Sequence, residues 1–374
     1  MKKMSFMVIS VLLVMSLFMT GCATTNTNAT TAATTTSASV SAATNAAPSD
    51  AGEIIKLRLG MFDVRNSLVT WYIMQNGLDK ANGFEIVPTV STAGGSFLNE
   101  AIGAGQLDAT LMGAPQGVYS ASVYDCVLVA EISDGAGSSG LFARPDSAEA
   151  KVIGSNPKFP EIRGSADTLK GKTFMYPVGS MSQLTVAKYL ELYGLSLSDV
   201  DSVNTNYGPG YQALQAGEGD VVALYSPLTL TAMKDGYVQI VSLDQIGIPV
   251  RDCLVVTRKA YEDPKLMEAV KRYLKLVFEY NDKFQADKEN QRKILAEFHK
   301  FYGNEITDPK MLDTEIEKHY LLTKDQAMAD IDNLGKSTLG IAEFYAELGI
   351  VEEDALDIVK ANVDTSIMKE LFGK

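Results

Sequence analysis

The residue types that most often perform chemistry are few in this chain of 374 residues. It has three cysteines, Cys22, Cys126 and Cys253, and two histidines, His299 and His319. No pair or cluster has the spacing of metal ligands, and no Ser-His or Cys-His constellation is suggested, so we expect no metal site, no cofactor and no catalytic centre. Both histidines stand in charged, helix-like sequence, which predicts surface positions. The chemistry that remains for this chain is the attachment of lipid at Cys22 and the non-covalent binding of a ligand.

Cys22 stands directly after a short apolar stretch. Positive charge begins the chain, residues 4–19 are apolar except for three serines, and Thr20 and Gly21 are small. Sixteen residues at about 1.5 Å each fall short of a bilayer core of roughly 30 Å, so the stretch is typical of a secretory signal peptide. The arrangement resembles a bacterial lipobox, which implies that residues 1–21 are removed and that Cys22 is acylated.

The segment 22–52 is composed almost entirely of Thr, Ala, Ser and Asn. Asp50 is its only charged residue and Val40 its only large apolar one. Such a segment cannot bury enough surface to offset the entropy of ordering it, so we expect a disordered tether. At about 5–6 Å × √n it would span some 30 Å. Several acyl chains on Cys22 would hold the folded domain outside the cytoplasm, close to the cell membrane.

The roughly 320 residues that follow are enough for one large two-lobed unit. The net charge of −13 becomes −15 once Lys2 and Lys3 leave with the signal peptide. So acidic a chain is a poor candidate for binding nucleic acid, which needs clustered Lys and Arg. Cys126 and Cys253 lie in strand-like runs, where buried free cysteines are common, although export would also permit a disulfide.

An internal repeat is the most informative feature of the chain. Residues 101–115 (AIGAGQLDATLMGAP) and 213–227 (ALQAGEGDVVALYSP) align without gaps. The pattern predicts a helix that ends at a glycine, a tight turn, a short buried strand and a proline that stops the strand. Chance similarity of two common turns is the alternative. The identical positions are Ala101 and Ala213, Ala104 and Ala216, Gly105 and Gly217, Asp108 and Asp220, Pro115 and Pro227.

Flanking sequence extends both copies into strand–helix–strand–helix–strand units. Two such units predict two α/β lobes with a cleft between them. A strand at residues 251–261 and a long helical tail then return the chain to the first lobe, with Pro264 suited to a first helical turn. The predicted first lobe therefore holds residues 53–145 and 250–374, and the second holds 146–249. Residues 132–137 are expected at the crossover edge, and the Pro- and Gly-rich segment 143–172 as the crossover and a surface excursion.

Several motifs in this order resemble the substrate-binding proteins of nitrate/sulfonate/taurine-type ABC importers. They are EAIGAGQLDA (100–109), LKGKTFMYPVGSMSQ (169–183), YGLSLSDVDSV (193–203), ALQAGEGDVVAL (213–224) and VVTRKAYEDPKLMEAVKRYL (255–274). The resemblance covers nearly the whole folded part. It implies the type II periplasmic-binding-protein fold, with two α/β lobes that close on a solute and a helical C-terminal tail on lobe one. It also implies a monomer that docks on ABC permease subunits.

In such lobes ligands bind beyond the carboxyl ends of the strands, where helix N-termini present free N–H groups. The loops expected there predict seventeen ligand-binding residues. In lobe one these are Asp63, Arg65, Asn66, Thr92, Gly94, Gly95, Ser96, Gly113, Ala114 and Gln116. In lobe two they are Ser180, Met181, Ser182, Gln183, Tyr207, Tyr225 and Ser226.

The residues leave the ligand open. Arg65 could pair with an anionic head group, or Asp63 could simply neutralise it. Ser182 could bind ligand or only cap a helix, while Tyr207 and Tyr225 could stack on a planar ring. A small oxyanion, sulfonate or carboxylate and a planar heteroaromatic such as a thiamine-pyrimidine precursor or a flavin therefore both stay possible. A sensory lipoprotein is an alternative function, and an enzyme on the same fold is the least favoured.

Overall fold

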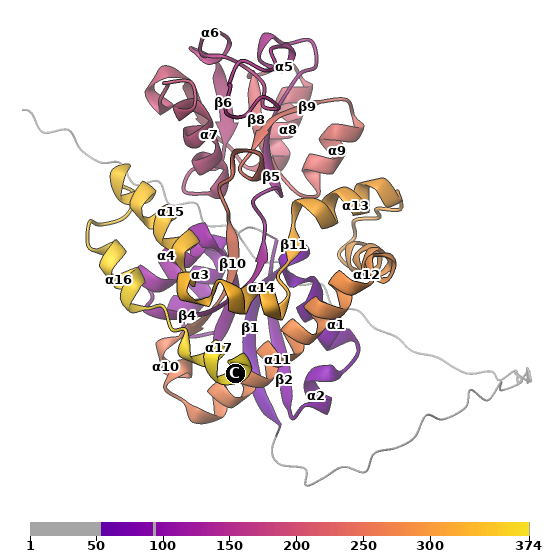
Figure 1. The fold of residues 1–374 in the computed structure, drawn as a ribbon, viewed down its shortest axis with the longest axis vertical. Helices are drawn as coiled ribbons and strands as arrows, with labels where there is room; N and C mark the ends of the chain where they lie inside the picture. Colours follow the sequence, from indigo (N-terminus) through magenta and orange to yellow (C-terminus); the bar gives the residue numbers. More distant parts are fainter. Residues whose placement is uncertain (1–53, 93–94, 374) are drawn as a thin grey trace, which may run out of the picture. The chain divides into compact units, whose positions relative to one another are not determined.

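The computed structural model describes residues 54–92 and 95–373, which form two mixed β-sheets with helices around them (Figure 1). The predicted signal peptide, Cys22 and the tether lie outside the described residues, as does Gly94. None of the helices in the described part is long and apolar enough to cross a membrane.

The first sheet has the strand order β11-β4-β10-β3-β1-β2. Strands β1, β2 and β3 are parallel, whereas β10 runs antiparallel to both β3 and β4. The chain therefore builds the parallel part first and adds the return strand later, as the sequence predicts. The strands are β1 (Ile55–Phe62), β2 (Phe84–Ser91), β3 (Ala109–Gly113), β4 (Cys126–Asp134), β10 (Arg251–Thr257) and β11 (Tyr320–Leu321).

The second sheet has the order β7-β6-β8-β5-β9, and β5 is antiparallel to both of its neighbours. Its strands are β5 (Ser139–Ala143), β6 (Thr173–Tyr176), β7 (Asp201–Asn204), β8 (Val221–Tyr225) and β9 (Val238–Ser242). We call the first sheet with its helices lobe one, and the second sheet with its helices lobe two. Lobe two contains α5 (Ala148–Lys151), α6 (Ala166–Leu169), α7 (Met181–Glu191), α8 (Tyr207–Gln215) and α9 (Leu228–Lys234).

The predicted boundary at residue 145 is wrong, because β5 already pairs with β8 and β9 of lobe two. The chain crosses between Asp134 and Ser139, close to the expected crossover edge at 132–137, and it returns between Ser242 and Arg251. Segment 143–172 consequently lies within lobe two. Composition suggested a crossover there, but strand pairing decides which lobe a segment joins.

The internal repeat has a physical cause that both lobes share. Gly105 and Gly217 take left-handed backbone angles, with φ of 69° and 84°, which L side chains rarely adopt. After each glycine the next N–H bonds back to the helix, from Gln106 to Ala101 and from Glu218 to Ala213, both at 2.9 Å. These bonds end α3 (Gly95–Gly103) and α8, and they turn the chain into β3 and β8.

The repeated aspartate ties each turn to the first strand of its unit. Asp108 Oδ2 accepts the backbone N–H of Arg58 at 2.9 Å, and Asp220 Oδ2 accepts that of Thr173 at 2.9 Å. A buried strand would otherwise leave that donor without a partner. The predicted strand–helix–strand–helix–strand unit is thus confirmed in both lobes.

The rest of lobe one consists of helices on its sheet, and those after β10 lie around it in orange to yellow (Figure 1). In α11 (Pro264–Ala286) Asp263 caps the first turn, and Val270, Leu274 and Phe278 are buried. Trp71 lies in the core. The other helices are α1 (Leu68–Gln75), α2 (Leu78–Ala81), α4 (Ala114–Ser122), α10 (Arg258–Tyr261), α12 (Lys288–Phe301), α13 (Pro309–Lys318), α14 (Lys324–Ala329), α15 (Lys336–Glu347), α16 (Ala355–Ala361) and α17 (Ser366–Phe372).

Candidate ligand-binding cleft

Arg65 follows β1 and is the largest fully buried side chain of the described residues, with 1% of its surface exposed. Its Nε donates to the backbone oxygen of His319 at 2.5 Å, while Nη1 and Nη2 are buried and have no hydrogen-bond partner. Burial lowers the pKa of Arg65 to about 10, although the nearby Glu315 carboxylate opposes this shift. A guanidinium remains charged at that pKa in neutral solution. Two buried, cationic donors therefore lack an acceptor.

Asp63 does not neutralise Arg65 in the described part of the chain, where no ion pair or hydrogen bond joins the two. The Asp63 side chain lies instead within electrostatic reach of His299. Burial raises the pKa of Asp63 above its ordinary value, and the residue's own backbone N–H and the nearby His299 oppose that shift only in part. Of the two roles that the sequence allowed for Arg65, neutralisation by Asp63 is not seen among the described residues, and pairing with an external anion remains a prediction.

The two histidines are not surface residues, so that prediction is wrong. His299 and His319 are 2% and 1% exposed, and the Nε2 of each lies on a carboxylate. His299 pairs with Glu315 at 2.8 Å, and His319 pairs with Asp252 at 2.7 Å. Each polar ring is satisfied by one acidic partner that approaches from another segment, which is how a buried polar group avoids the cost of lost hydration.

On lobe two, the loop GSMSQ begins α7, and much of it serves the helix end. Ser180 caps the helix, because its Oγ accepts the Ser182 N–H at 3.2 Å, and Gln183 accepts the Gly179 N–H at 2.8 Å. The Ser182 hydroxyl is different, since it lies 3.3 Å from the Tyr207 hydroxyl and 3.3 Å from Ser139 Oγ. Ser182 thus belongs to a group of hydroxyls, whereas Ser180 and Gln183 have structural partners and Met181 is buried.

Tyr207 and Tyr225 lie side by side, with ring centroids 6.1 Å apart and an angle of 29° between the rings. Burial raises the pKa of Tyr225 well above its ordinary value, and the Asp252 carboxylate, Tyr207 and the Glu315 carboxylate of lobe one add to the shift. Burial also raises the pKa of Tyr207, against the hydrogen bond from Ser182. Tyr225 of lobe two therefore lies within electrostatic reach of Glu315, as Arg65 of lobe one does.

Two tyrosines that the sequence did not single out extend this group. Tyr345 of α15 is fully buried, its hydroxyl has no hydrogen-bond partner, and its ring centroid lies 5.9 Å from that of Tyr119. Burial raises the pKa of Tyr345, and Tyr119 and Tyr207 add to that shift, so Tyr345 lies between residues of both lobes. A Cβ on Gly179 would lie 3.7 Å from the Tyr119 hydroxyl, which shows that the two lobes approach each other here.

The other predicted residues lie at the ends of lobe-one strands. Gly95 begins α3 so close to Gln116 that a Cβ on the glycine would clash with Gln116 Cγ. Gly113 ends β3, and a Cβ there would lie 3.6 Å from Asp252 Oδ1. Asn66 and Ala114 are buried, as is Ser226, whose Oγ has no partner, whereas Thr92 and Ser96 are exposed. Contacts join Ser182, Tyr207 and Tyr225, and both Tyr225 and Arg65 lie within electrostatic reach of Glu315. Contact of these residues or of Gln116 with a ligand remains a prediction.

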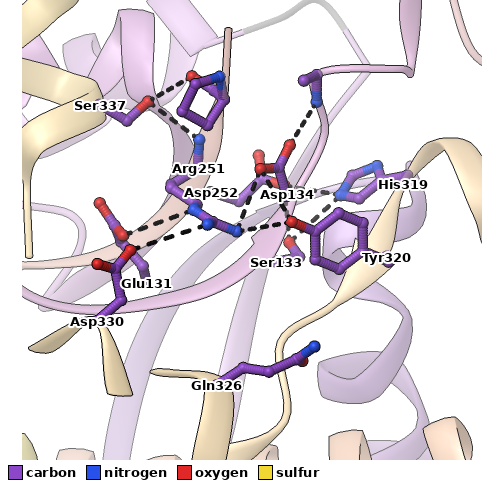
Figure 2. A network of polar contacts seen from close by, with 12 residues as sticks. Glu131, Ser133, Asp134, Arg251, Asp252, His319, Tyr320, Gln326, Asp330 and Ser337 are labelled. Atoms are coloured by element: carbon purple, nitrogen blue, oxygen red, sulfur yellow. Dashed lines mark hydrogen bonds and ion pairs between the residues drawn. The ribbon is translucent and has the colours of Figure 1, made fainter. Parts of the chain in front are cut away.

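A second group of charges lies where β4 and β10 leave lobe one (Figure 2). Arg251 Nη1 is 3.1 Å from Asp134 Oδ2, while its Nε and Nη2 lie 4.0 Å and 3.9 Å from carboxylate oxygens of Glu131 and Asp330. Burial raises the pKa of Glu131 to about 7 and raises that of Asp134. We call Arg251, Glu131, Asp134 and Asp330 the hinge cluster, because both crossovers between the lobes start or end at it.

A pocket of about 510 Å³ reaches the hinge cluster from the side of α7 and α15. Glu131, Arg251 and Asp330 line it together with Lys188 of lobe two. Arg251 and Asp252 are neighbours on one strand, so their side chains point to opposite faces of the sheet. The pocket therefore lies on the Arg251 face, away from the face on which Asp252 meets His319.

We expect Glu131→Gln to make the protein more stable above about pH 7. The folded-state pKa of about 7 is above the ordinary 4.5, so the folded protein binds this proton more tightly than the unfolded chain does. The stability that Glu131 contributes is full below about pH 4.5 and is lost as the pH rises through 7. The glutamine side chain of the variant keeps an acceptor for the Gly335 N–H, which Glu131 accepts at 3.1 Å. Urea unfolding from pH 4.5 to 8 should give a flatter profile for the variant.

Glu343→Gln, at an exposed position of α15, serves as the control and should leave the profile unchanged. Equal profiles for Glu131→Gln and the unsubstituted protein would contradict the assignment of this titration to Glu131.

The candidate site thus combines the charged donors of Arg65 with hydroxyls and aromatic rings of lobe two. Cys126 and Cys253 are both buried and free. Among the described residues no group of three His, Cys, Asp or Glu side chains could hold a metal ion. The residues that sequence reasoning missed are Asp252, Glu315, His319, Tyr119 and Tyr345. Asp252 gave one signal, since it and Arg251 are charged residues directly before the apolar run Cys253 to Val256.

Comparisons with known proteins agree with this arrangement. Residues 55–318 match the family described as the substrate-binding domain of the ABC-type glycine betaine transport system. A protein of Brachyspira hyodysenteriae described as an ABC transporter periplasmic binding protein is 32% identical over 328 residues, which cover 87% of this chain and 91% of that protein.

Solved structures share the fold at low sequence identity. The alkanesulfonate-binding protein SsuA of Xanthomonas axonopodis pv. citri, bound to MOPS, gives a TM-score of 0.62 at 16% identity over 84% of this chain and 99% of that one. The nitrate-binding protein NrtA of Synechocystis gives 0.63 at 13% identity over 85% and 88%. The predicted periplasmic-binding-protein fold is thereby confirmed. This chain belongs to the family of ABC-type substrate-binding domains that its residues 55–318 match, which is a family of transport proteins and not of enzymes. The protein is thus the substrate-binding component of an ABC transporter.

Proposed function

We propose that this protein captures a small anion between its two lobes and delivers it to an ABC permease while a lipid on Cys22 holds it at the cell membrane. The single observation that supports an anion is Arg65, whose two terminal nitrogens are buried without a partner. A buried donor without an acceptor costs about 1–3 kcal/mol, and more when it is charged. An anionic ligand would supply the missing acceptors through a bidentate pair.

The rest of the ligand would lie against the tyrosines. Tyr207 and Tyr225 present adjacent rings, and Ser182 places a hydroxyl beside them. Flat or apolar groups pack well on such rings. We therefore infer a ligand that has a sulfonate, carboxylate or similar oxyanion at Arg65 and a compact body on lobe two. The fold likeness to SsuA and NrtA is compatible with an oxyanion, and what those proteins bind is only a guide here.

Calorimetric titration of the purified protein with ethanesulfonate, nitrate, acetate, benzoate and a neutral pyrimidine tests this proposal. We expect at least one anion to bind, and the corresponding thermal midpoint to rise, because a ligand at a hundred times its dissociation constant adds about 2.7 kcal/mol of stability. The neutral pyrimidine should bind weakly or not at all. Binding of the neutral ring alone would favour the second candidate, a planar heteroaromatic held by Tyr207 and Tyr225.

A further inference from the structure

We propose that His319 is a positioning residue that fixes the guanidinium of Arg65 to the two strands of the hinge. This inference rests on the proposed function, since it matters for binding only if Arg65 holds the ligand. Nothing in the sequence motifs or in the comparisons gives His319 a role.

The first step is the contact between the two residues. The hydrogen bond from Arg65 Nε to the His319 backbone oxygen, at 2.5 Å, is the only one that the Arg65 side chain makes among the described residues. Arginine has a long side chain with several rotatable bonds, and one fixed hydrogen bond near its end sets the plane of the whole guanidinium. The position of the residue 319 carbonyl consequently decides where Nη1 and Nη2 point.

The second step is what holds residue 319. Its Nε2 donates to Asp252 Oδ2 at 2.7 Å, and Ser133 Oγ, which lies 3.3 Å from Nε2, donates to the same oxygen at 2.7 Å (Figure 2). The ring is 1% exposed, so water does not compete for these bonds. Asp252 lies on β10 and Ser133 on β4, and a short ladder of β11 on β4 follows directly at Tyr320.

The third step is the place of these strands. β4 runs into the first crossover to lobe two, and β10 receives the second one. His319 therefore connects the binding group to both hinge strands, through its backbone on one side and its ring on the other. A site that must hold a donor in one orientation needs such support from residues that do not touch the ligand. Lobe closure and the direction of Arg65 would then change together.

The test compares three variants. His319→Asn shortens the side chain so that it no longer reaches Asp252, and His319→Gln places an amide N–H near the position of Nε2. Tyr273→Phe is the matched control, because it removes a buried 2.6 Å hydrogen bond of the same lobe, to Thr70, that has no contact with Arg65. Asp252→Asn, which keeps the shape of the side chain, replaces His319→Asn if that variant does not fold.

The first measurement needs no ligand. The ¹H–¹⁵N resonance of Arg65 Nε, identified by its loss in Arg65→Lys, should exchange slowly with water in the unsubstituted protein. In His319→Asn we expect it to shift and to exchange at least about tenfold faster. His319→Gln should restore most of the protection, and Tyr273→Phe should leave the resonance unchanged. An unchanged Arg65 resonance in His319→Asn would overturn the proposal.

The second measurement is calorimetric affinity for ethanesulfonate. His319→Asn should weaken binding by about 10–100-fold, which is the usual cost of removing a group that orients a binding residue. Normal affinity in His319→Asn alongside lost affinity in Arg65→Lys would also overturn the positioning role. If Arg65→Lys binds as well as the unsubstituted protein, the proposed function of Arg65 fails instead, and the resonance still decides whether His319 positions it.

Discussion

Replacing Arg65 with methionine should weaken anion binding by about a hundredfold or more and at the same time make the ligand-free protein more stable. A bidentate, charge-assisted pair contributes roughly 1.5–3 kcal/mol per hydrogen bond, and 1.4 kcal/mol corresponds to a tenfold change in affinity. The stability gain follows because Arg65 is a buried cation with two unpartnered nitrogens. Exchanging a poorly compensated buried charge for an apolar side chain of similar size stabilises proteins by about 1–4 kcal/mol.

The lowered pKa of Arg65 agrees with the expected gain in stability of Arg65→Met. Burial lowers it from 12.5 to about 10, so folding disfavours the charged form at every pH below about 10. The cost is therefore the same throughout the neutral range, and the stability difference between Arg65→Met and the unsubstituted protein should not vary between pH 6 and 8. Urea unfolding without ligand and calorimetric titration with the anion that binds best measure the two effects.

Arg58→Met is the matched control for this substitution. Arg58 forms an ion pair with Asp108, at 2.5 Å from Nη2 to Oδ1 and 3.1 Å from Nε to Oδ2, outside the cleft. Its loss should lower the free energy of unfolding and leave the affinity unchanged, which is the opposite pattern. A clear loss of stability in Arg65→Met would mean that the guanidinium supports the fold and that its free nitrogens do not await a ligand.

The contrast between Arg65 and Arg58 also shows that local contacts could be predicted from the sequence, whereas contacts between distant segments could not. The turn at Gly105 and Asp108 could be predicted because a left-handed glycine and a capping aspartate act over a few residues, and the second copy repeated the pattern. The partner of Arg65 could not, since the His319 carbonyl comes from 254 positions further along the chain. Only the folded structure can show whether Asp63, Glu315 or a ligand balances the positive charge of Arg65.

The prediction that both histidines are surface residues was wrong for the same reason, because their partners come from other segments of the chain. His299 lies in a charged, helix-like segment, and such a pattern normally belongs to a solvated face. A buried histidine next to a buried glutamate is equally compatible with that pattern, because both residue types count as polar when helical faces are assigned from the sequence. Strand β5 shows a second limit of prediction from sequence. Its pairing with β8 and β9 sets the lobe boundary, and amino-acid composition does not indicate which strands pair.

The hinge cluster supports a second large effect: Arg251→Met should lower the free energy of unfolding by about 3–5 kcal/mol at pH 7.5. Arg251 is the cation that faces Glu131, Asp134 and Asp330, and breaking a buried ion pair by removing one partner has costs of this size. Arg251 Nη1 also donates to the Tyr320 hydroxyl at 3.1 Å, and that hydroxyl donates to Asp134. One substitution therefore leaves two mostly buried carboxylates without their counter-charge.

The loss should depend on pH in a defined direction. The pKa values of Glu131 and Asp134 are already raised by burial and are lowered in part by Arg251, so in the variant they rise further. Carboxyls with raised folded-state pKa values keep their stabilising contribution at low pH and lose it as the pH rises through those values. The difference between the two proteins should thus be small near pH 4.5 and largest above pH 7. Urea unfolding at both pH values measures it.

Arg292→Met separates this effect from the loss of any ion pair. Arg292 binds Asp313 at 2.9 Å, but both side chains are about one third exposed, and such solvated pairs contribute little to stability. If Arg251→Met costs no more than Arg292→Met at pH 7.5, the hinge cluster does not hold β4 and β10 together. A large cost confined to high pH would instead show that Arg251 balances the charge of the carboxylates at the point where β4 and β10 leave lobe one.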